Sequence, residues 1–106
     1  MLVAQSITFD LIRSLRPVVA QLKFHSADLA DQLARAATSV ALNLAEGTRR
    51  RARDKRRVYR IAAAEAQEVR AALETAAAWG YLDDDILAAP RALADRLGAL
   101  TFGLAR

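Results

Sequence analysis

The sequence predicts an all-α protein: an antiparallel up-down-up-down four-helix bundle that residues 1–106 form as a single domain. Its 106 residues include 25 Ala and 15 Leu, but only 15 Val, Ile and Thr together. Ala and Leu favour helices, whereas β-branched residues favour strands. Apolar residues recur with helical spacing in four segments, and strong breaks occur only at Ser26, Gly47 and Gly80. Four helices with short connections in a chain of this length predict an antiparallel bundle.

The first helix is expected from about Ser6 to Phe24. Its apolar stripe has the spacing of one helical face and consists of Leu11, Leu15, Val18 and Leu22, widened by Ile12 and Val19. Pro17 lies inside this segment. Because proline lacks an N–H group and clashes with the carbonyl four residues earlier, we expect a kink over residues 13–17.

The second helix is expected to begin after Ser26, whose side chain can cap it, with Asp28 in its first turn. We expect Gly47 to end it by a left-handed turn. Its core stripe is Leu29, Leu33, Ala36, Val40 and Leu44. Asn43 on this helix is predicted to form a structural hydrogen bond across the bundle.

The third helix is predicted from about Ala52 to Trp79, where Gly80 stops it. Its expected apolar face is Val58, Ile61, Val69, Leu73 and Ala76. Trp79 and Tyr81 bracket the glycine and are expected to seal one end of the bundle.

Two acids lie at the apolar side of this helix, with Glu65 within the apolar arc and Glu68 beside it. Paired carboxylates in bundles can hold two metal ions, but such sites need a Glu-x-x-His pattern on two helices and the chain has one histidine. We therefore predict no metal site. An ion pair between helices or protomers is expected for Glu65, with Arg35 or Arg70 available.

The fourth helix has two possible starts, at the acidic run Asp83–Asp85 or nearer Pro90. Its expected stripe is Ile86, Leu93, Leu97, Leu100 and Leu104. Gly98 and Gly103 should each cost about 0.5–1 kcal/mol relative to Ala. We therefore expect a neighbouring backbone to come close to both glycines.

The basic charge is concentrated in one short segment. The net charge is +4, but residues 49–60 alone carry +7. The cations are Arg49, Arg50, Arg51, Arg53, Lys55, Arg56, Arg57 and Arg60. Guanidinium groups match phosphate geometry, so this segment predicts nucleic-acid binding rather than only a solvated helix face. Because no Asn or Gln lies among them to contact base edges, binding should have little sequence preference. Tyr59 is expected at a helix contact rather than stacked on a base.

Several other functions are not expected. The chain has no cysteine and no apolar run of the roughly 18 residues that a membrane span needs. It shows no signal-peptide pattern over Met1–Asp10, so we expect a cytoplasmic protein with no membrane partner. Without a glycine-rich phosphate loop or a nucleophile paired with a base, we expect no enzyme and no cofactor. His25, at a turn, is expected to be solvated or to cap a helix.

An ordered series of short motifs runs through the middle of the chain. It comprises Ser39-Val40-Ala41-Leu42-Asn43-Leu44, then Ala45-Glu46-Gly47, an arginine-rich turn, Ile61-Ala62, Glu68 and Gly80-Tyr81-Leu82-Asp83. The series, with the spacing of Gly98 and Gly103, resembles the bacterial four-helix-bundle family encoded within intervening sequences of 23S ribosomal RNA genes. That family also includes the accessory variability proteins of diversity-generating retroelements.

The resemblance implies a four-helix protomer assembled as a homopentamer with a basic surface, and for the retroelement members a reverse transcriptase partner. Glu46, at the end of the second helix, is the acid that matches the family, and we expect it to fix the turn after that helix by a hydrogen bond rather than to contact a partner. Many members carry Gly and Ser where this chain has Arg49–Arg51, and apolar residues where it has Lys55 and Arg56. Asp54 is the expected replacement for the missing serine cap.

The leading hypothesis is a non-catalytic homo-oligomer that binds RNA or DNA as an accessory or chaperone of a nucleic-acid-processing system. The alternative is an oligomeric adaptor whose basic patch docks an acidic protein.

Overall fold

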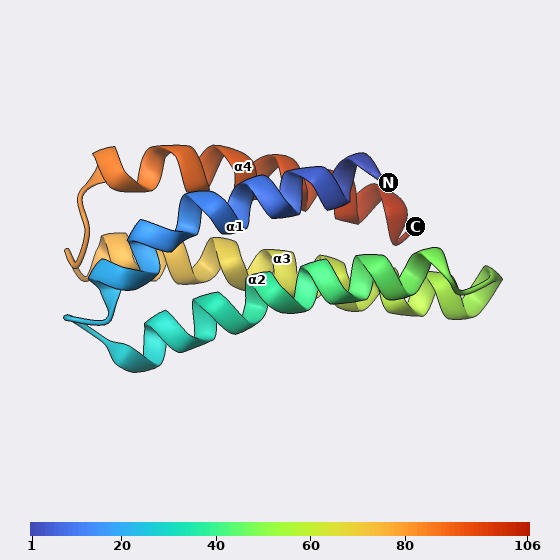
Figure 1. Cartoon of the computed structure of the whole chain (residues 1–106), viewed down its shortest axis with the longest axis horizontal. Coiled ribbons are helices and arrows are strands. Elements are labelled where there is room, and N and C mark those ends of the chain that lie inside the picture. Colours follow the sequence, from blue (N-terminus) through green and yellow to red (C-terminus); the bar gives the residue numbers. More distant parts are fainter.

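The computed structural model describes all 106 residues and contains four helices. They are α1 (Val3–Leu22), α2 (Ala27–Thr48), α3 (Ala52–Ala78) and α4 (Asp84–Leu104). Each helix packs against its neighbours in the chain, and α4 closes the bundle against α1 (Figure 1). The predicted antiparallel four-helix bundle is confirmed. None of the four helices has the length and hydrophobicity that crossing a membrane requires.

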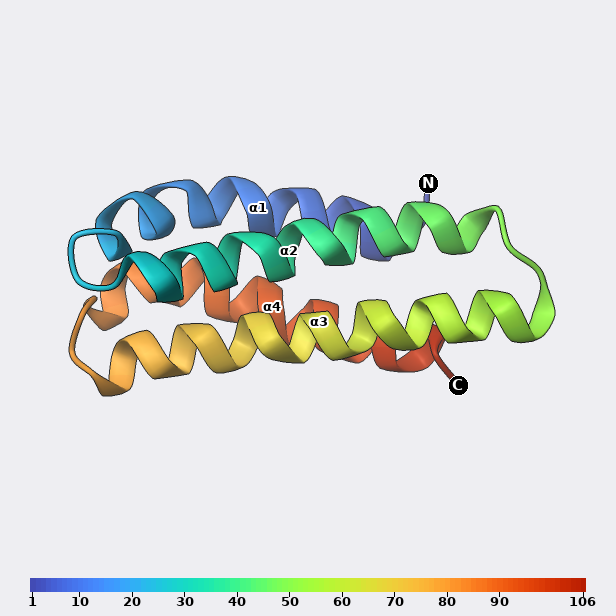
Figure 2. The ribbon, with the colours of Figure 1, turned by 90° about the horizontal axis from the view of Figure 1, so that it is seen from below.

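The bundle is elongated, 42 × 22 × 19 Å, and its two ends differ. The α1–α2 and α3–α4 turns lie together at one end (Figures 1 and 2). At the other end α2 and α3 extend past both chain termini, so that the α2–α3 turn projects from the bundle as a two-helix hairpin. We call residues 46–60, which form this projection, the basic tip.

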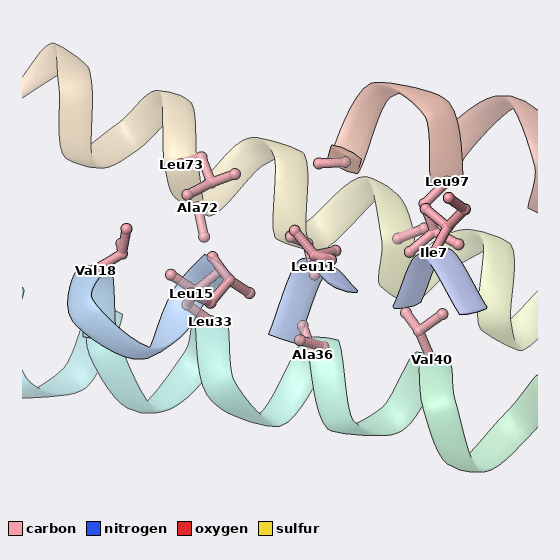
Figure 3. Close-up of a cluster of buried hydrophobic side chains, with 14 of the residues drawn as sticks. Ile7, Leu11, Leu15, Val18, Leu33, Ala36, Val40, Ala72, Leu73 and Leu97 are labelled. Atoms are coloured by element: carbon pink, nitrogen blue, oxygen red, sulfur yellow. The ribbon is translucent and has the colours of Figure 1, made fainter. Parts of the chain in front are cut away.

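One continuous hydrophobic core connects the four helices. Leu11 and Leu15 of α1 lie between side chains of α2, such as Leu33, and Leu73 of α3 (Figure 3). The largest fully buried hydrophobic side chains are Leu11, Leu22, Leu33, Leu44, Leu73, Leu87, Leu97, Val18, Val40 and Val69. The stripes predicted for the first two helices therefore form the core, although Ile12, Val19 and Leu29 are only partly buried.

The first helix starts earlier than predicted, and the start of the fourth helix decides between the two predicted positions. The first helix begins at Val3, before Ser6, because the backbone N–H of Leu2 donates to Gln5 Oε1 at 2.7 Å and so caps the earlier turn. It then continues as one helix through Pro17. The fourth begins at Asp84 rather than near Pro90, which lies buried inside the helix.

The end of α2 also differs, because Gly47 is not in the left-handed conformation and the helix continues to Thr48. Gly47 is buried against the ring of Tyr59, where a Cβ would lie 2.7 Å from Tyr59 Cδ1. Glycine is therefore required here for close packing rather than for chain reversal. Gly80, with φ +74°, ends α3 as predicted.

The buried side of α4 is rotated from the predicted stripe. On α3 the predicted stripe is buried except at one position: Val58, Val69, Leu73 and Ala76 are all buried. Ile61 is 39% exposed, and Tyr59, Ala62 and Ala66 are buried on α3 as well. On α4, Leu97 is fully buried as predicted. Ile86, Leu93, Leu100 and Leu104 are only partly buried, because the centre of that helix's contact with the core is formed by Leu87, Ala94, Leu97 and Thr101. Each helix contacts two neighbours, so small residues between them can be buried more deeply than the larger ones beside them.

Candidate nucleic-acid interface

The basic tip brings together all eight cations of the predicted segment, from the end of α2, the turn and the first turns of α3. Seven are exposed, and Lys55 is half-buried. Together with the acids Glu46 and Asp54, residues 46–60 carry a net charge of +6. The projecting end of the molecule is therefore its most positive part.

Glu46 and Asp54 hold three of the arginines in place. Glu46 accepts hydrogen bonds from Arg49 Nη2 at 2.7 Å and Arg50 Nε at 2.8 Å. Asp54 accepts from Arg57 Nη2 and Arg50 Nη1, each at 3.0 Å. Arg50 thus bridges the two carboxylates across the turn. The hydrogen bonds expected for Glu46 at this turn are present.

These contacts shift the pKa of both acids downward. The hydrogen bond from Arg49 is the main cause of the lowered pKa of Glu46, followed by the one from Arg50. The hydrogen bond from Arg57 is the main cause of the lowered pKa of Asp54. The hydrogen bonds from the arginines therefore favour the ionised form of both carboxylates.

Five cations of the basic tip make no ion pair within the chain: Arg51, Arg53, Lys55, Arg56 and Arg60. Arg53, Arg56 and Arg60 are spaced three and four residues apart, which places them on one face of α3 over about 10 Å of helix. The buried Val58 and Tyr59 lie on other faces. Three guanidinium groups are thus directed to solvent along the hairpin.

The turn leading into α3 is held in an uncommon backbone conformation. Ala52 has φ +47°, in the left-handed region, which costs a non-glycine residue roughly 1–2 kcal/mol. Arg51 occupies the N-cap position without a capping side chain. The expectation that Asp54 replaces the missing cap is wrong, because its carboxylate binds Arg50 and Arg57 instead.

Tyr59 is 5% exposed and packs on Gly47, which confirms the predicted helix contact. Asn43 does not cross the bundle: its amide donates to Ser39 O at 2.9 Å and to Ser39 Oγ at 3.0 Å, both within α2. The four-residue spacing places these two residues one helical turn apart, where a local hydrogen bond competes with one across the bundle.

Glu65 has no arginine partner within the chain. Arg70 instead donates to Asp95 Oδ1 of α4 at 3.0 Å. Burial is the main cause of the raised pKa of Glu65, and the hydrogen bond and charge of Glu68 raise that pKa further. The two acids line a hollow between α2 and α3 with Arg35, but no ion pair forms there.

The two helical glycines of α4 have different surroundings. A Cβ on Gly98 would lie 3.4 Å from Arg70 Nη1 and from Gln67 Nε2, so side chains of α3, not its backbone, come close. Nothing lies within 4 Å of the corresponding position on Gly103. The expected close approach to Gly103 is therefore absent within the chain.

An aromatic stack at the opposite end was not predicted. The His25 ring lies 5.2 Å from the Tyr81 ring, and the Trp79 ring lies 6.2 Å from Tyr81, both near-parallel at 15°. Trp79 is 70% exposed, so it does not seal the bundle as expected. The sequence places His25 in the first turn and Trp79 and Tyr81 in the third turn. In an antiparallel four-helix bundle these two turns lie at the same end, so the stack could have been predicted. No group of three or more His, Cys, Asp or Glu side chains is arranged to hold a metal ion.

Comparisons with known proteins agree with this architecture. The family described as 23S rRNA-intervening sequence protein matches residues 4–103. The crystal structure of a protein of unknown function from the S23 ribosomal protein family of Bacteroides thetaiotaomicron superposes with a TM-score of 0.86, covering 98% of this chain and 99% of that one at 17% identity. No curated protein matches the chain in sequence.

Proposed function

The chain belongs to the 23S rRNA-intervening sequence protein family, and from this premise we propose that it is a non-catalytic protein that binds RNA or DNA through the phosphate backbone. The observation that carries the proposal is the projecting basic tip, where five cations have no carboxylate partner in the chain. Each phosphate that such a group neutralises releases counterions, which favours binding to any sequence. No Asn or Gln lies between Arg49 and Arg60 to discriminate base edges.

The paired arginines support the same function in another way. Glu46 and Asp54 fix the positions of Arg49, Arg50 and Arg57 around the turn. They also keep part of the local charge compensated, which limits repulsion within the tip. The free arginines of α3 are consequently presented on an ordered hairpin, so that less side-chain and backbone freedom is lost when a nucleic acid binds.

We further propose that the functional unit is a homo-oligomer, with the family's pentamer as the expected state. The alanine-rich core buries little area per residue, while large apolar side chains remain on the surface: Leu42 is 66% exposed and Phe102 is 65% exposed. The open position at Gly103 leaves room for a neighbouring helix. Repetition of the basic tip in an oligomer would strengthen weak phosphate contacts by avidity.

Removal of the free arginines of α3 tests the nucleic-acid proposal. The variant Arg53→Gln, Arg56→Gln, Arg60→Gln keeps the helix propensity and the Glu46 and Asp54 contacts, so the fold should persist. Binding to random-sequence RNA and duplex DNA should weaken for every sequence. The slope of log affinity against log salt should flatten by up to about 0.9 per lost duplex contact for each engaged chain.

A matched control removes three positive charges elsewhere, Arg13→Gln, Arg16→Gln and Arg96→Gln, and so has the same net charge. This variant should bind nearly as well as the parent protein. The proposal fails if the folded tip variant binds as tightly as the parent across a salt series, or if both variants are weakened equally.

A further inference from the structure

The end of the molecule opposite the basic tip is acidic. It consists of residues 21–31 and 74–91, around the α1–α2 and α3–α4 turns (Figures 1 and 2). These segments contain six Asp or Glu and two Lys or Arg, a net charge of −4, against +6 for the basic tip. Because the long dimension of the bundle is 42 Å, opposite charges are held far apart on one small protein.

A groove lies at this acidic end, between the first turns of α2 and the last turns of α3. It has a volume of about 430 Å³ and is lined by Asp28, Glu68, Trp79 and Tyr81 among others. Neither Asp28 nor Glu68 takes part in an ion pair within the chain; Asp28 only accepts a hydrogen bond from Gln32 at 2.9 Å. Trp79 is 70% exposed and stacks on Tyr81, which stacks on His25.

This combination of groups suits a guanidinium ion. Trp is the most favourable ring for a cation placed over its face, and arginine is the cation found there most often. A carboxylate elsewhere in the groove can accept two parallel hydrogen bonds from a second guanidinium. The acidic charge of this end repels phosphate, so a nucleic acid is a poor occupant. The groove therefore fits an arginine side chain that a positively charged surface presents.

The chain itself supplies such a surface. We propose that the groove of one molecule binds the basic tip of a second copy, with one arginine of that tip over Trp79 and another paired with the carboxylate of Asp28 or Glu68. The tip projects beyond α1 and α4, so its exposed arginine side chains are accessible to a groove on another molecule. The charges at the two ends are complementary, and the five unpaired cations of the tip are available for the contact.

The contact joins unlike surfaces, so after one contact forms one molecule still has a free tip and the other still has a free groove. Such head-to-tail association extends into chains or closes into rings. It uses the ends of the bundle, whereas the exposed Leu42 and Phe102 lie on its helices, so both modes of association can coexist. The docking does not require nucleic-acid binding, but both use the basic tip, and a nucleic acid should therefore compete with it.

Two variants that each lack one surface test the proposal. The tip variant is Arg53→Gln, Arg56→Gln, Arg60→Gln, and the groove variant is Asp28→Asn, Glu68→Gln, Trp79→Ala. The substituted side chains are all exposed, so both variants should fold. At low salt, each variant alone should associate end to end at least about tenfold more weakly than the parent, since a cation–π contact and a charged hydrogen bond are lost. A mixture of the two should regain the contact, because one supplies the tip and the other the groove.

Energy transfer between dyes placed on the two variants measures the mixed contact. The control carries all six substitutions and is mixed with a differently labelled sample of itself, which reports any subunit exchange through the side faces. The proposal is contradicted if the mixture gives no more transfer at low salt than this control. The groove variant should still bind random RNA, so a failure of docking is distinguishable from a failure of nucleic-acid binding.

Discussion

Gly47 and Tyr59 pack against each other where α2 and α3 enter the basic tip. The sequence motif that contains Gly47 predicted a helix-ending turn, but the ring of Tyr59 occupies the space that a Cβ would need. The contact joins residues on two helices across the turn, which periodicity along either helix does not reveal. Local sequence rules identified glycine as special here and assigned the wrong reason.

Gly47→Ala should therefore destabilise the protein. A Cβ 2.7 Å from Tyr59 Cδ1 forces the buried ring or the helix to move, and overpacking of this kind costs about 1–3 kcal/mol, more than the roughly 1 kcal/mol that Ala gains over Gly in a helix. Urea unfolding measures the difference. In a Tyr59→Ala background the same substitution should become neutral or stabilising, and an equal loss in both backgrounds would contradict the packing argument.

Glu65 predicts a pH dependence with a defined sign. Its pKa is raised in the folded state, first by burial and then by Glu68. The folded protein therefore binds this proton more tightly than the unfolded chain, and this group lowers stability as the pH rises from about 4.3 through the raised pKa. Glu65→Gln should remove that loss and increase stability at neutral pH, as thermal unfolding at several pH values would show.

Glu46→Gln provides a control of opposite sign. The pKa of Glu46 is lowered by Arg49 and Arg50, so its contribution to stability is present above its ordinary pKa and is lost as the pH falls through the lowered value. The variant should thus lose stability at neutral pH. A neutral-pH stability change of the same sign in both variants would refute this assignment of the two glutamates.

At the scale of the helices, periodicity and end signals predicted most of the fold. Ser26 caps α2, its Oγ accepting from Leu29 N at 3.1 Å, and the positive φ of Gly80 ends α3. The misplaced positions lie on α3 and α4, where Ile61 and Leu93 are more exposed than predicted. The predicted stripes were chosen from large hydrophobic residues at helical spacing. This choice passed over the alanines that lie nearer the bundle axis.

Leu97→Ala tests the packing of α4. The side chain is fully buried, so its truncation should cost about 2–5 kcal/mol, through lost transfer energy and a residual cavity. Leu100→Ala, the same change at a partly buried position one turn along the helix, should cost clearly less. Equal shifts of the urea midpoint for the two variants would show that α4 packs through a different side.

At the scale of the whole molecule, the arginine cluster could be predicted from the sequence because its members are adjacent in the chain. The acidic groove could not, since Asp28 and Trp79 lie about fifty residues apart and come together only through the antiparallel packing of α2 and α3. The division of the eight cations into paired and unpaired groups likewise depended on side-chain geometry around the turn.

The proposed oligomer predicts a particle mass well above that of one chain. Static light scattering on dilute protein should give a mass near five times 11.5 kDa. High salt should leave this mass unchanged if apolar side faces such as that around Leu42 hold the oligomer, while it should dissociate any end-to-end contact. A stable folded monomer at micromolar concentration would be incompatible with the oligomer.

The projection of the basic tip beyond α1 and α4 has a consequence for local dynamics. Four helices surround the middle of the core, but only two helices form the tip, and Val58 is buried there without belonging to the main hydrophobic cluster. Fewer apolar contacts oppose opening of this segment, so its backbone amides should exchange with deuterium faster than those of the central turns. A polyanion bound at the tip would slow exchange at the end of α2 and the start of α3, whereas a polyanion bound elsewhere would leave this fast-exchanging segment unprotected.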